Sequence, residues 1–245
     1  MYSEFANVYD ALMRDADYTA RSKYLLSLFE KFDRKPTLLL DLACGTGGFS
    51  NEFSKEGVQV IGVDVSAEML SIARENSMEQ GQDVLYLCQN ATELDLYGTV
   101  DGAICCLDSL NHITDYDDFK AAIGKVSLFL EPERLFIFDV NTIYKHEIVL
   151  GNNTIVKETD DVYCVWQNEY NEGTNTTDIN LDFFICEDGV YYRSDEHFCE
   201  RAYTDTEIAA ACGEAGLEII AVFDEMTENP TTDKTERAVY ITRKR

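Results

Sequence analysis

The chain has 245 residues, 45% of them hydrophobic, which is enough to bury the core of one large domain or of a domain with an added lobe. Its formal net charge of −26 repels phosphate backbones and anionic lipids, which argues against nucleic acid or a membrane surface as a partner. No apolar run approaches the roughly 20 residues of a membrane helix, and the first residues lack the pattern of a signal peptide, so we expect a cytoplasmic protein.

Short apolar runs alternate with helix-like segments from residue 37 to Asn141, which is typical of a parallel sheet wrapped by helices. The pattern predicts strands at residues 37–42, 58–64, 84–88, 100–107 and 134–139. It predicts helices at residues 47–56, 66–80 and 116–130. Ser66 is a good N-cap for the second of these helices, and Gly81 is a good stop.

The region after Asn141 is rich in β-type sequence. Runs at residues 154–160, 162–170, 176–186 and 189–201 are separated by turn-forming residues, and they predict an inserted antiparallel meander. One face of the third run should be packed, because polar residues alternate there with Ile179, Leu181, Phe183 and Ile185. The α/β order then returns, with a helix from Thr204 to Ala215 and an antiparallel hairpin of strands at 217–223 and 238–243.

The first strand runs into an acid and a glycine turn, LLLDLACGTGGFS at residues 38–50, as nucleotide-binding turns do. A dinucleotide turn of the G-x-G-x-x-G type fits Gly45 and Gly47 but requires glycine or alanine where Ser50 stands. A second pattern, an acid at the strand end and small residues at every second turn position, fits better. It is matched by Asp41, Ala43, Gly45 and Gly47. The turn alone leaves both cofactor classes open.

Asp64 ends the second strand, and a carboxylate there can accept hydrogen bonds from both hydroxyls of a ribose. Met69, one helical turn further on, fits either the face of a purine or the ordinary core. Both cofactor classes share the ribose-binding acid, so Asp64 predicts a nucleotide-like ligand without choosing between them.

Four sequence blocks stand out: DLACGTGG, VIGVDVSAEML, VLYLCQNATEL, and the pair DGAICCLDSLNHI with LFIFDVNT. These blocks resemble the motifs of the class I S-adenosylmethionine-dependent methyltransferases, in the small-molecule branch, and the resemblance covers nearly the whole chain. It implies an α/β fold with a Rossmann-like seven-stranded sheet, mostly parallel with an antiparallel last strand, helices on both faces and the inserted meander. Residues 1–141 and 202–245 would form the cofactor-binding domain, and residues 142–201 a β-rich lobe that caps the substrate.

The resemblance implies S-adenosyl-L-methionine as the cofactor. Asn90 stands where the family usually has an aspartate, but its amide oxygen can still accept a hydrogen bond from the adenine amino group. Tyr9 lies in FANVYDALM, which resembles the family's N-terminal lid, and it either touches the ligands or packs a helix end. The residues implied to bind the cofactor are Tyr9, Asp41, Ala43, Cys44, Gly45, Gly47, Asp64, Val65, Met69, Asn90, Ala91, Leu107 and Asp108.

Methyl transfer is an in-line displacement, so the protein must chiefly align the acceptor and exclude water. Parallel sheets bind ligands beyond the carboxyl ends of their strands, and the meander would roof that site. Asp108 would border the acceptor as well as the cofactor. The candidate substrate-binding residues are Asn111, Asn141, Tyr144, Arg193, Arg201 and Tyr203.

Two histidines, His197 and His112, are the candidate catalytic bases. Strand alternation puts His197 on one face with Arg193, Asp195 and Arg201, and this face is either the pocket wall or solvated surface. The resemblance favours His197, because N-methyltransferases of this branch carry an acid two residues before a histidine, ahead of an aromatic-Thr pair. The third histidine, His146, is expected to be exposed.

The eight cysteines form no CxxC pair and have only three histidines as possible co-ligands, so no metal site is expected. Most of them lie in strand-like runs, where they fit small buried hydrophobes in a reducing compartment.

We therefore expect an S-adenosylmethionine-dependent methyltransferase acting on a small-molecule methyl acceptor, with N-methylation of an amine favoured over O-methylation. An NAD-dependent oxidoreductase is the alternative from another enzyme class, and Ser50 and the final antiparallel hairpin argue against it. A non-catalytic module that only binds the cofactor is a third reading. The acceptor and the oligomeric state, monomer or homodimer, stay open.

Overall fold

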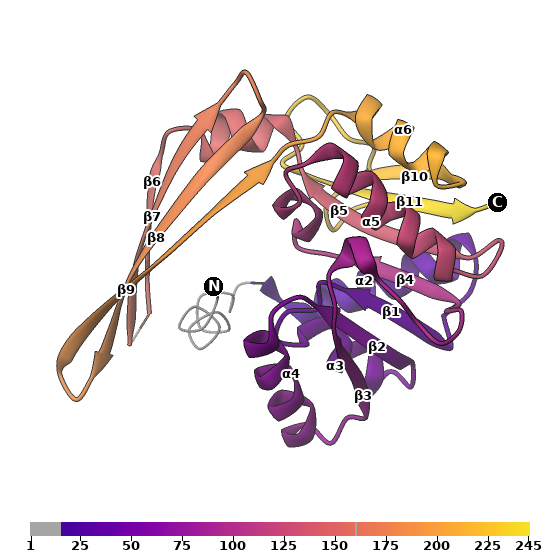
Figure 1. Ribbon diagram of the computed structural model, residues 1–245, viewed down its shortest axis with the longest axis horizontal. Coiled ribbons are helices and arrows are strands. Elements are labelled where there is room, and N and C mark those ends of the chain that lie inside the picture. The colour runs from indigo at the N-terminus through magenta and orange to yellow at the C-terminus, as the bar shows by residue number, and fades with distance from the viewer. Residues whose placement is uncertain (1–15, 160) are drawn as a thin grey trace.

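A computed structural model describes residues 16–245 apart from residue 160. Its centre is a seven-stranded sheet in the order β10-β11-β5-β4-β1-β2-β3, in which β11 runs antiparallel to both of its neighbours (Figure 1). The strands are β1 (Leu38–Leu42), β2 (Gln59–Asp64), β3 (Val84–Cys88), β4 (Gly102–Cys105), β5 (Leu135–Asn141), β10 (Leu217–Asp224) and β11 (Arg237–Lys244). This order confirms the predicted fold class.

Helices cover both faces of this sheet. They are α2 (Tyr18–Phe32), α3 (Gly48–Lys55), α4 (Ala67–Glu79), α5 (Tyr116–Phe129) and α6 (Asp205–Glu214). Side chains alternate along β1, so Leu39 packs with α2 and α3 while Leu40 packs with α5 and α6. Helix α2 was not predicted from the sequence, although Leu25, Leu28 and Phe29 are buried at helical spacing.

No helix of the described residues is both long enough and apolar enough to cross a membrane.

The helix caps are those expected from the sequence. The side chain of Ser66 accepts a 3.1 Å hydrogen bond from the main-chain N–H of Met69 at the start of α4. Thr204 and Glu207 form a reciprocal capping box at the start of α6. These caps fix where each helix begins after the strand or loop that precedes it.

A second sheet is inserted between β5 and α6 and projects away from the first (Figure 1). Its antiparallel strands are β6 (Thr154–Glu158), β7 (Val162–Asn171), β8 (Thr176–Glu187) and β9 (Val190–Arg201), in that order. Its packed face includes Ile179, Leu181 and Phe183, which confirms the predicted alternation along β8. A helical turn, η4 (Lys145–Leu150), leads into this sheet, and the end of β9 returns beside η3 (Ser109–His112).

Candidate active site

A pocket of about 360 Å³ opens beyond the carboxyl ends of β1, β2, β3 and β4. Seven of the residues predicted to bind the cofactor line it: Ala43, Gly45, Asp64, Val65, Met69, Asn90 and Ala91. The lining also includes His112 and several residues that the sequence analysis did not name, Gln89, Cys105, Ser109, Leu110 and Ile113 among them. Tyr9 lies outside the described residues.

The glycine turn between β1 and α3 is built from left-handed backbone. Ala43, Gly45 and Gly47 have φ angles of 57°, 53° and 79°. A Cβ atom on Gly47 would stand 2.3 Å from the hydroxyl oxygen of Tyr86, so only glycine fits there. A Cβ atom on Gly45 would meet no atom within 4 Å, because Gly45 faces the pocket. Gly47 is therefore needed for packing behind the turn, whereas Gly45 keeps the ligand side open.

The carboxylate of Asp64 closes the turn from the neighbouring strand. Its Oδ2 accepts a 2.9 Å hydrogen bond from Gly45 N–H, and its Oδ1 accepts a 2.8 Å bond from Ser66 N–H. Burial raises the pKa of Asp64, and these main-chain donors act in the opposite direction. A carboxylate has room for about four donors, so Asp64 can still accept both hydroxyls of a ribose. This geometry fits S-adenosyl-L-methionine.

Asp41 supports the turn from behind and does not line the pocket. Its side chain is only 2% exposed, and its Oδ2 accepts a 2.6 Å hydrogen bond from the hydroxyl of Ser50. Burial raises the pKa of Asp41 to about 7. The same contact accounts for Ser50, the residue that breaks the dinucleotide motif. Cys44, Gly47, Leu107 and Asp108, also predicted to bind the cofactor, likewise lie outside the pocket lining.

Asn90 borders the pocket, and its amide oxygen already accepts hydrogen bonds within the protein. That oxygen accepts hydrogen bonds of 3.0 Å and 3.1 Å from the main-chain N–H and the hydroxyl of Thr92, at the start of a short helical turn. Any hydrogen bond from adenine to this oxygen would have to share it with Thr92.

The end of β4 is held by a buried ion network that the sequence analysis missed. The main-chain N–H groups of Leu107 and Asp108 donate to the two carboxylate oxygens of Asp139, at 2.8 Å and 2.7 Å. Arg237 of β11 lies 2.7 Å from Asp108 and 3.4 Å from Asp139, measured between guanidinium nitrogens and carboxylate oxygens. Both residues preceding η3 have positive φ angles, 55° each, and this network stabilises that unusual backbone.

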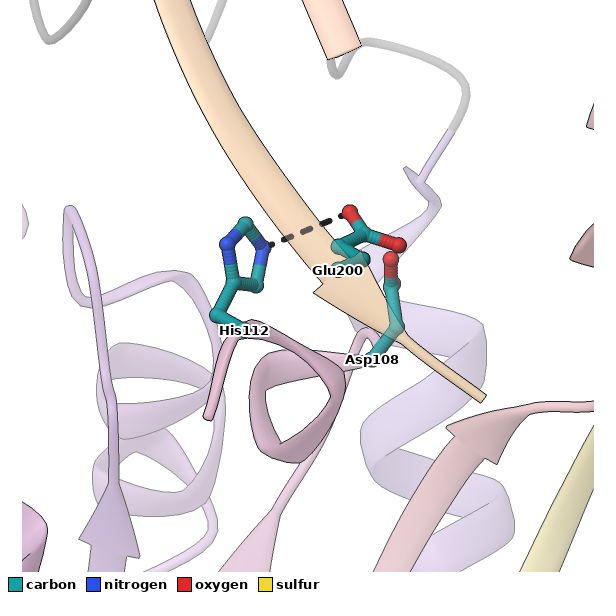
Figure 2. A group of neighbouring side chains, drawn as sticks. All are labelled: Asp108, His112 and Glu200. Carbon is teal, nitrogen blue, oxygen red and sulfur yellow. Dashed lines mark ion pairs between the residues drawn. The ribbon is translucent and has the colours of Figure 1, made fainter. Parts of the chain in front are cut away.

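Asp108, His112 and Glu200 meet where β9 of the inserted sheet reaches η3, and His112 of this group also lines the pocket (Figure 2). His112 Nε2 lies 3.6 Å from Glu200 Oε1, and the imidazole ring packs on Phe198 with ring centroids 5.0 Å apart. The carboxyl of Glu200 is 4% exposed, whereas 36% of the His112 side chain remains accessible. The structure therefore brings a residue of the meander to the predicted base His112, but that residue is Glu200 rather than His197.

His146 lies behind Glu200. Its ring is fully buried, so the expectation that it is exposed was wrong. The turn η4 folds under the second sheet, where His146 Nδ1 is 2.8 Å from the hydroxyl of Thr177 and Nε2 is 3.7 Å from Glu200 Oε2. Burial lowers the pKa of His146 to about 4, so the ring is neutral near pH 7.

The electrostatics of this cluster favour neutral forms. Burial, together with the charge of Asp108, raises the pKa of Glu200 to about 8, and Arg237 acts against both. Desolvation by the surrounding protein lowers the pKa of His112, and the negative charges of Asp108 and Asp64 raise it in part. Near pH 7 Glu200 is therefore largely protonated, and the rings of His112 and His146 are largely neutral.

Asp108, His112 and Glu200 offer three ligand-type atoms within 4.8 Å of one another, as a metal site would. One oxygen of Asp108 is 2.7 Å from the guanidinium of Arg237, and the other accepts a 2.8 Å hydrogen bond from Asn141 Nδ2. A metal ion would have to compete with the cation Arg237 for Asp108. The arrangement therefore favours a shared proton over a metal ion.

Several residues predicted to bind substrate instead tie main-chain segments together. Asn111 is fully buried: its Nδ2 donates to the carbonyls of Asn141 and Arg201, and its Oδ1 accepts from Asn141 N–H. Arg201 donates to the carbonyl of Thr114 and pairs with Glu207, and Tyr203 donates from its hydroxyl to the carbonyl of Ile113. Tyr144 and Tyr203 line a separate cavity of about 380 Å³ beside α6. The geometry gives these side chains structural partners and not a place in the cofactor pocket.

His197 and Arg193 lie on the outer face of β9. The side chain of His197 is 59% exposed with Asp178 3.6 Å away, and Arg193 is 62% exposed beside Asp182. Successive side chains of a strand point to opposite faces, so His197 and Glu200 face opposite ways. The sequence signal for Glu200 was an acid on the same face as Phe198, at the point where β9 meets α6.

The family model described as "Methyltransferase domain" matches residues 39–133 of the chain. A Bacillus subtilis (strain 168) protein named as a methyltransferase, YqeM, is 29% identical over all of this chain and 97% of its own length. A crystal structure of an S-adenosylmethionine-dependent methyltransferase from Clostridium acetobutylicum is 33% identical, with a TM-score of 0.90 over 99% of this chain and 98% of that one.

The sugar N-methyltransferase KedS8 from Streptoalloteichus has the same fold, with a TM-score of 0.79 over 97% of this chain and 93% of its own at 16% identity. That match includes the second sheet as well as the first. The glycine turn, the ribose-binding acid and these similarities lead to one conclusion: the chain belongs to the S-adenosylmethionine-dependent methyltransferases of small-molecule type and takes S-adenosyl-L-methionine as its cofactor.

Proposed function

We propose that the protein transfers a methyl group to the nitrogen of a small amine. The observation that carries this proposal is the group Asp108, His112 and Glu200, which is rich in acceptor atoms and acidic groups and whose His112 lines the pocket (Figure 2). A protonated amine brings a positive charge and N–H donors, so it complements this group better than an alcohol would. The likeness to a sugar N-methyltransferase along 97% of the chain supports the same choice.

The pocket residues take distinct parts of the cofactor in this proposal. Asp64 accepts the ribose hydroxyls, the main chain of Ala43 and Gly45 approaches the amino-acid portion, and Asn90 with Ala91 borders the adenine. When bound, S-adenosyl-L-methionine supplies an electrophilic methyl group on a sulfonium sulfur. The chain has only to position the acceptor and exclude water.

His112 takes the proton of the acceptor. An amine attacks only through an unprotonated nitrogen, so a nearby group must accept the proton that the ammonium form carries. Because burial lowers the pKa of His112, its ring is largely neutral near pH 7 and offers a lone pair. Phe198 covers that ring, and residues 142–201 act as a lobe that roofs the acceptor.

We also propose that the acceptor is a free small molecule in the cytoplasm. The net charge of −26 opposes binding to nucleic acid. All eight cysteines are unpaired thiols, which fits a reducing compartment.

The test is a thermal-shift screen followed by a methyl-transfer assay. S-adenosylmethionine and S-adenosylhomocysteine should raise the Tm, and NAD should not. Label from methyl-labelled S-adenosylmethionine should then move to members of a panel of small amines and not to alcohols of the same size and shape. Label on the alcohols alone would replace N-methylation by O-methylation. Cofactor binding without transfer to either panel would favour a non-catalytic module.

A further inference from the structure

Glu200 reaches His112 from the inserted sheet, and one of its oxygens has no hydrogen-bond partner among the described residues. That oxygen is Oε2, and the side chain as a whole is 4% exposed. An enclosed acid with an orphaned oxygen costs stability unless it serves a purpose or holds a proton. The groups around Glu200 indicate which of these two explanations applies.

The groups that face Glu200 come from several elements. They are Asp108 after β4, His112 of η3, Asn141 of β5, Lys145 and His146 of η4, and Arg237 of β11. Each oxygen of Glu200 has a histidine nitrogen nearby: His112 Nε2 lies 3.6 Å from Oε1, and His146 Nε2 lies 3.7 Å from Oε2. Glu200 therefore stands between two imidazole rings.

His146 holds the far side of this arrangement. The contact of its Nδ1 with Thr177 fixes the ring, and its Nε2 is a second orphaned atom that faces Glu200 Oε2. At 3.7 Å the two atoms do not yet form a hydrogen bond, and a single proton between them would satisfy both after a small closing movement. The contact between Glu200 Oε2 and His146 Nε2 therefore explains why Glu200 is protonated before substrate binds. The other oxygen, Oε1, remains available to His112.

We propose that Glu200 is a positioning residue for His112: its oxygen Oε1 keeps the ring proton on Nε2, so that Nδ1, on the opposite side of the ring (Figure 2), accepts the proton of the amine. In that step the N–H bond of the ammonium breaks, its electron pair stays on the amine nitrogen, and a new N–H bond forms at Nδ1. The imidazolium that results is stabilised by the Glu200 carboxylate. This inference rests on the proposed N-methylation.

The present separation of 3.6 Å between His112 Nε2 and Glu200 Oε1 is longer than a hydrogen bond, as expected while Glu200 is protonated and uncharged. Burial and Asp108 raise the pKa of Glu200 to about 8. Above that pH the carboxylate would draw the Nε2–H of His112 toward Oε1. Glu200 and His112 should then titrate as one coupled unit.

The experiment is a pH titration of the histidine side chains by NMR in the whole protein, with bound S-adenosylhomocysteine. The chain has only three histidines, so each ring gives a separate set of ¹⁵N signals. The His112 signals should show a step near pH 8 with the same midpoint as the ¹³C signal of the Glu200 carboxyl. Glu200→Gln should abolish that step, and Glu200→Asp should restore a weaker one.

Glu196→Gln is the matched control, because Glu196 lies on the same face of β9 but the acid that His112 approaches is Glu200. It should leave the His112 step in place. Separate midpoints for Glu200 and His112 in the unmodified protein would overturn the proposal even if Glu200→Gln failed to fold. No acceptor is needed for this measurement, so its failure would leave the N-methylation proposal standing. With an active amine in hand, Glu200→Gln should lower kcat about tenfold at unchanged cofactor affinity.

Discussion

The hydroxyl of Ser50 donates a 2.6 Å hydrogen bond to the buried carboxyl of Asp41, directly behind the cofactor turn. Asp41 has a pKa of about 7 in the folded protein because of burial, against 3.8 as an ordinary aspartate. The folded state therefore binds more protons than the unfolded state between these two values, and the contribution of Asp41 to stability falls as the pH rises through this window.

Replacement of Asp41 by asparagine removes this titration. The stability of Asp41→Asn relative to the unmodified protein should therefore rise between pH 4 and pH 7. Urea unfolding followed by circular dichroism at several pH values measures this difference. Ser50→Ala removes a hydrogen bond that lowers the pKa of Asp41. In this variant the pKa of Asp41 should rise further, so the pH range over which stability falls should extend to higher pH. A pH-independent difference for Asp41→Asn would contradict the assignment.

Two glycines of the turn should fail in different ways when each is changed to alanine. Gly47→Ala would place Cβ 2.3 Å from the Tyr86 hydroxyl on backbone with a φ of 79°, so it should cost about 1–3 kcal/mol of stability. Gly45→Ala has open space around Cβ but narrows the pocket, so it should weaken cofactor binding more than it lowers the Tm. Thermal unfolding and calorimetry with S-adenosylhomocysteine separate the two effects. Equal profiles for both variants would refute this division.

The glycine turn and the acid at the end of the second strand could be predicted because each is recognised from a short stretch of sequence. The strand, turn and helix around Gly45 follow one another within a few residues, and Asp64 ends the adjacent strand. Each of these residue types is required by backbone geometry or by hydrogen bonding that a short segment determines. Seven of the residues predicted to bind the cofactor therefore line one pocket, whereas Asp41, Cys44, Gly47, Leu107 and Asp108 do not.

The part of the site expected to bind the methyl acceptor depends on contacts between segments that are distant in sequence. Such contacts cannot be predicted from the pattern of a single sequence. Alternation along β9 showed that His197 and Glu200 face opposite ways, but not which of the two faces turns toward η3. Asn111 was interpreted as a ligand because it is polar and follows a parallel strand. Its actual partners are main-chain groups of Asn141 and Arg201 that only the folded chain brings together.

Asp64→Asn should weaken binding of S-adenosylhomocysteine by about 1–3 kcal/mol, the cost of unpairing hydrogen bonds to a buried charge. The variant also turns an N–H group toward the main-chain donor of Gly45 or of Ser66. Isothermal titration calorimetry measures the loss. Glu68→Gln, an exposed acid in the first turn of α4, serves as the control and should bind with unchanged affinity. Equal affinity for Asp64→Asn and the unmodified protein would remove Asp64 from the ribose site.

Removal of metal ions should not change the activity. Arg237 and Asn141 already engage both oxygens of Asp108, so methyl transfer should persist after dialysis against EDTA. Addition of Mg²⁺ or Zn²⁺ to the dialysed protein should give no increase in rate. A rate that falls with EDTA and returns with one of these ions would establish a metal at Asp108, His112 and Glu200.

Variants of His112, which lies on η3 beside Glu200, and of His197, on the outer face of β9, test which face of β9 turns toward the acceptor. His112 lines the cofactor pocket, so His112→Asn should lower kcat on the order of 10- to 100-fold as a proton acceptor is lost. His197 is 59% exposed on the other face, so His197→Asn should leave kcat within experimental error. Affinity for S-adenosylhomocysteine should be nearly the same in both variants, which separates a loss of chemistry from a loss of fold. If His197→Asn alone reduced turnover, the acceptor would have to bind against the outer face of the inserted sheet, and Glu200 would have no part in the reaction.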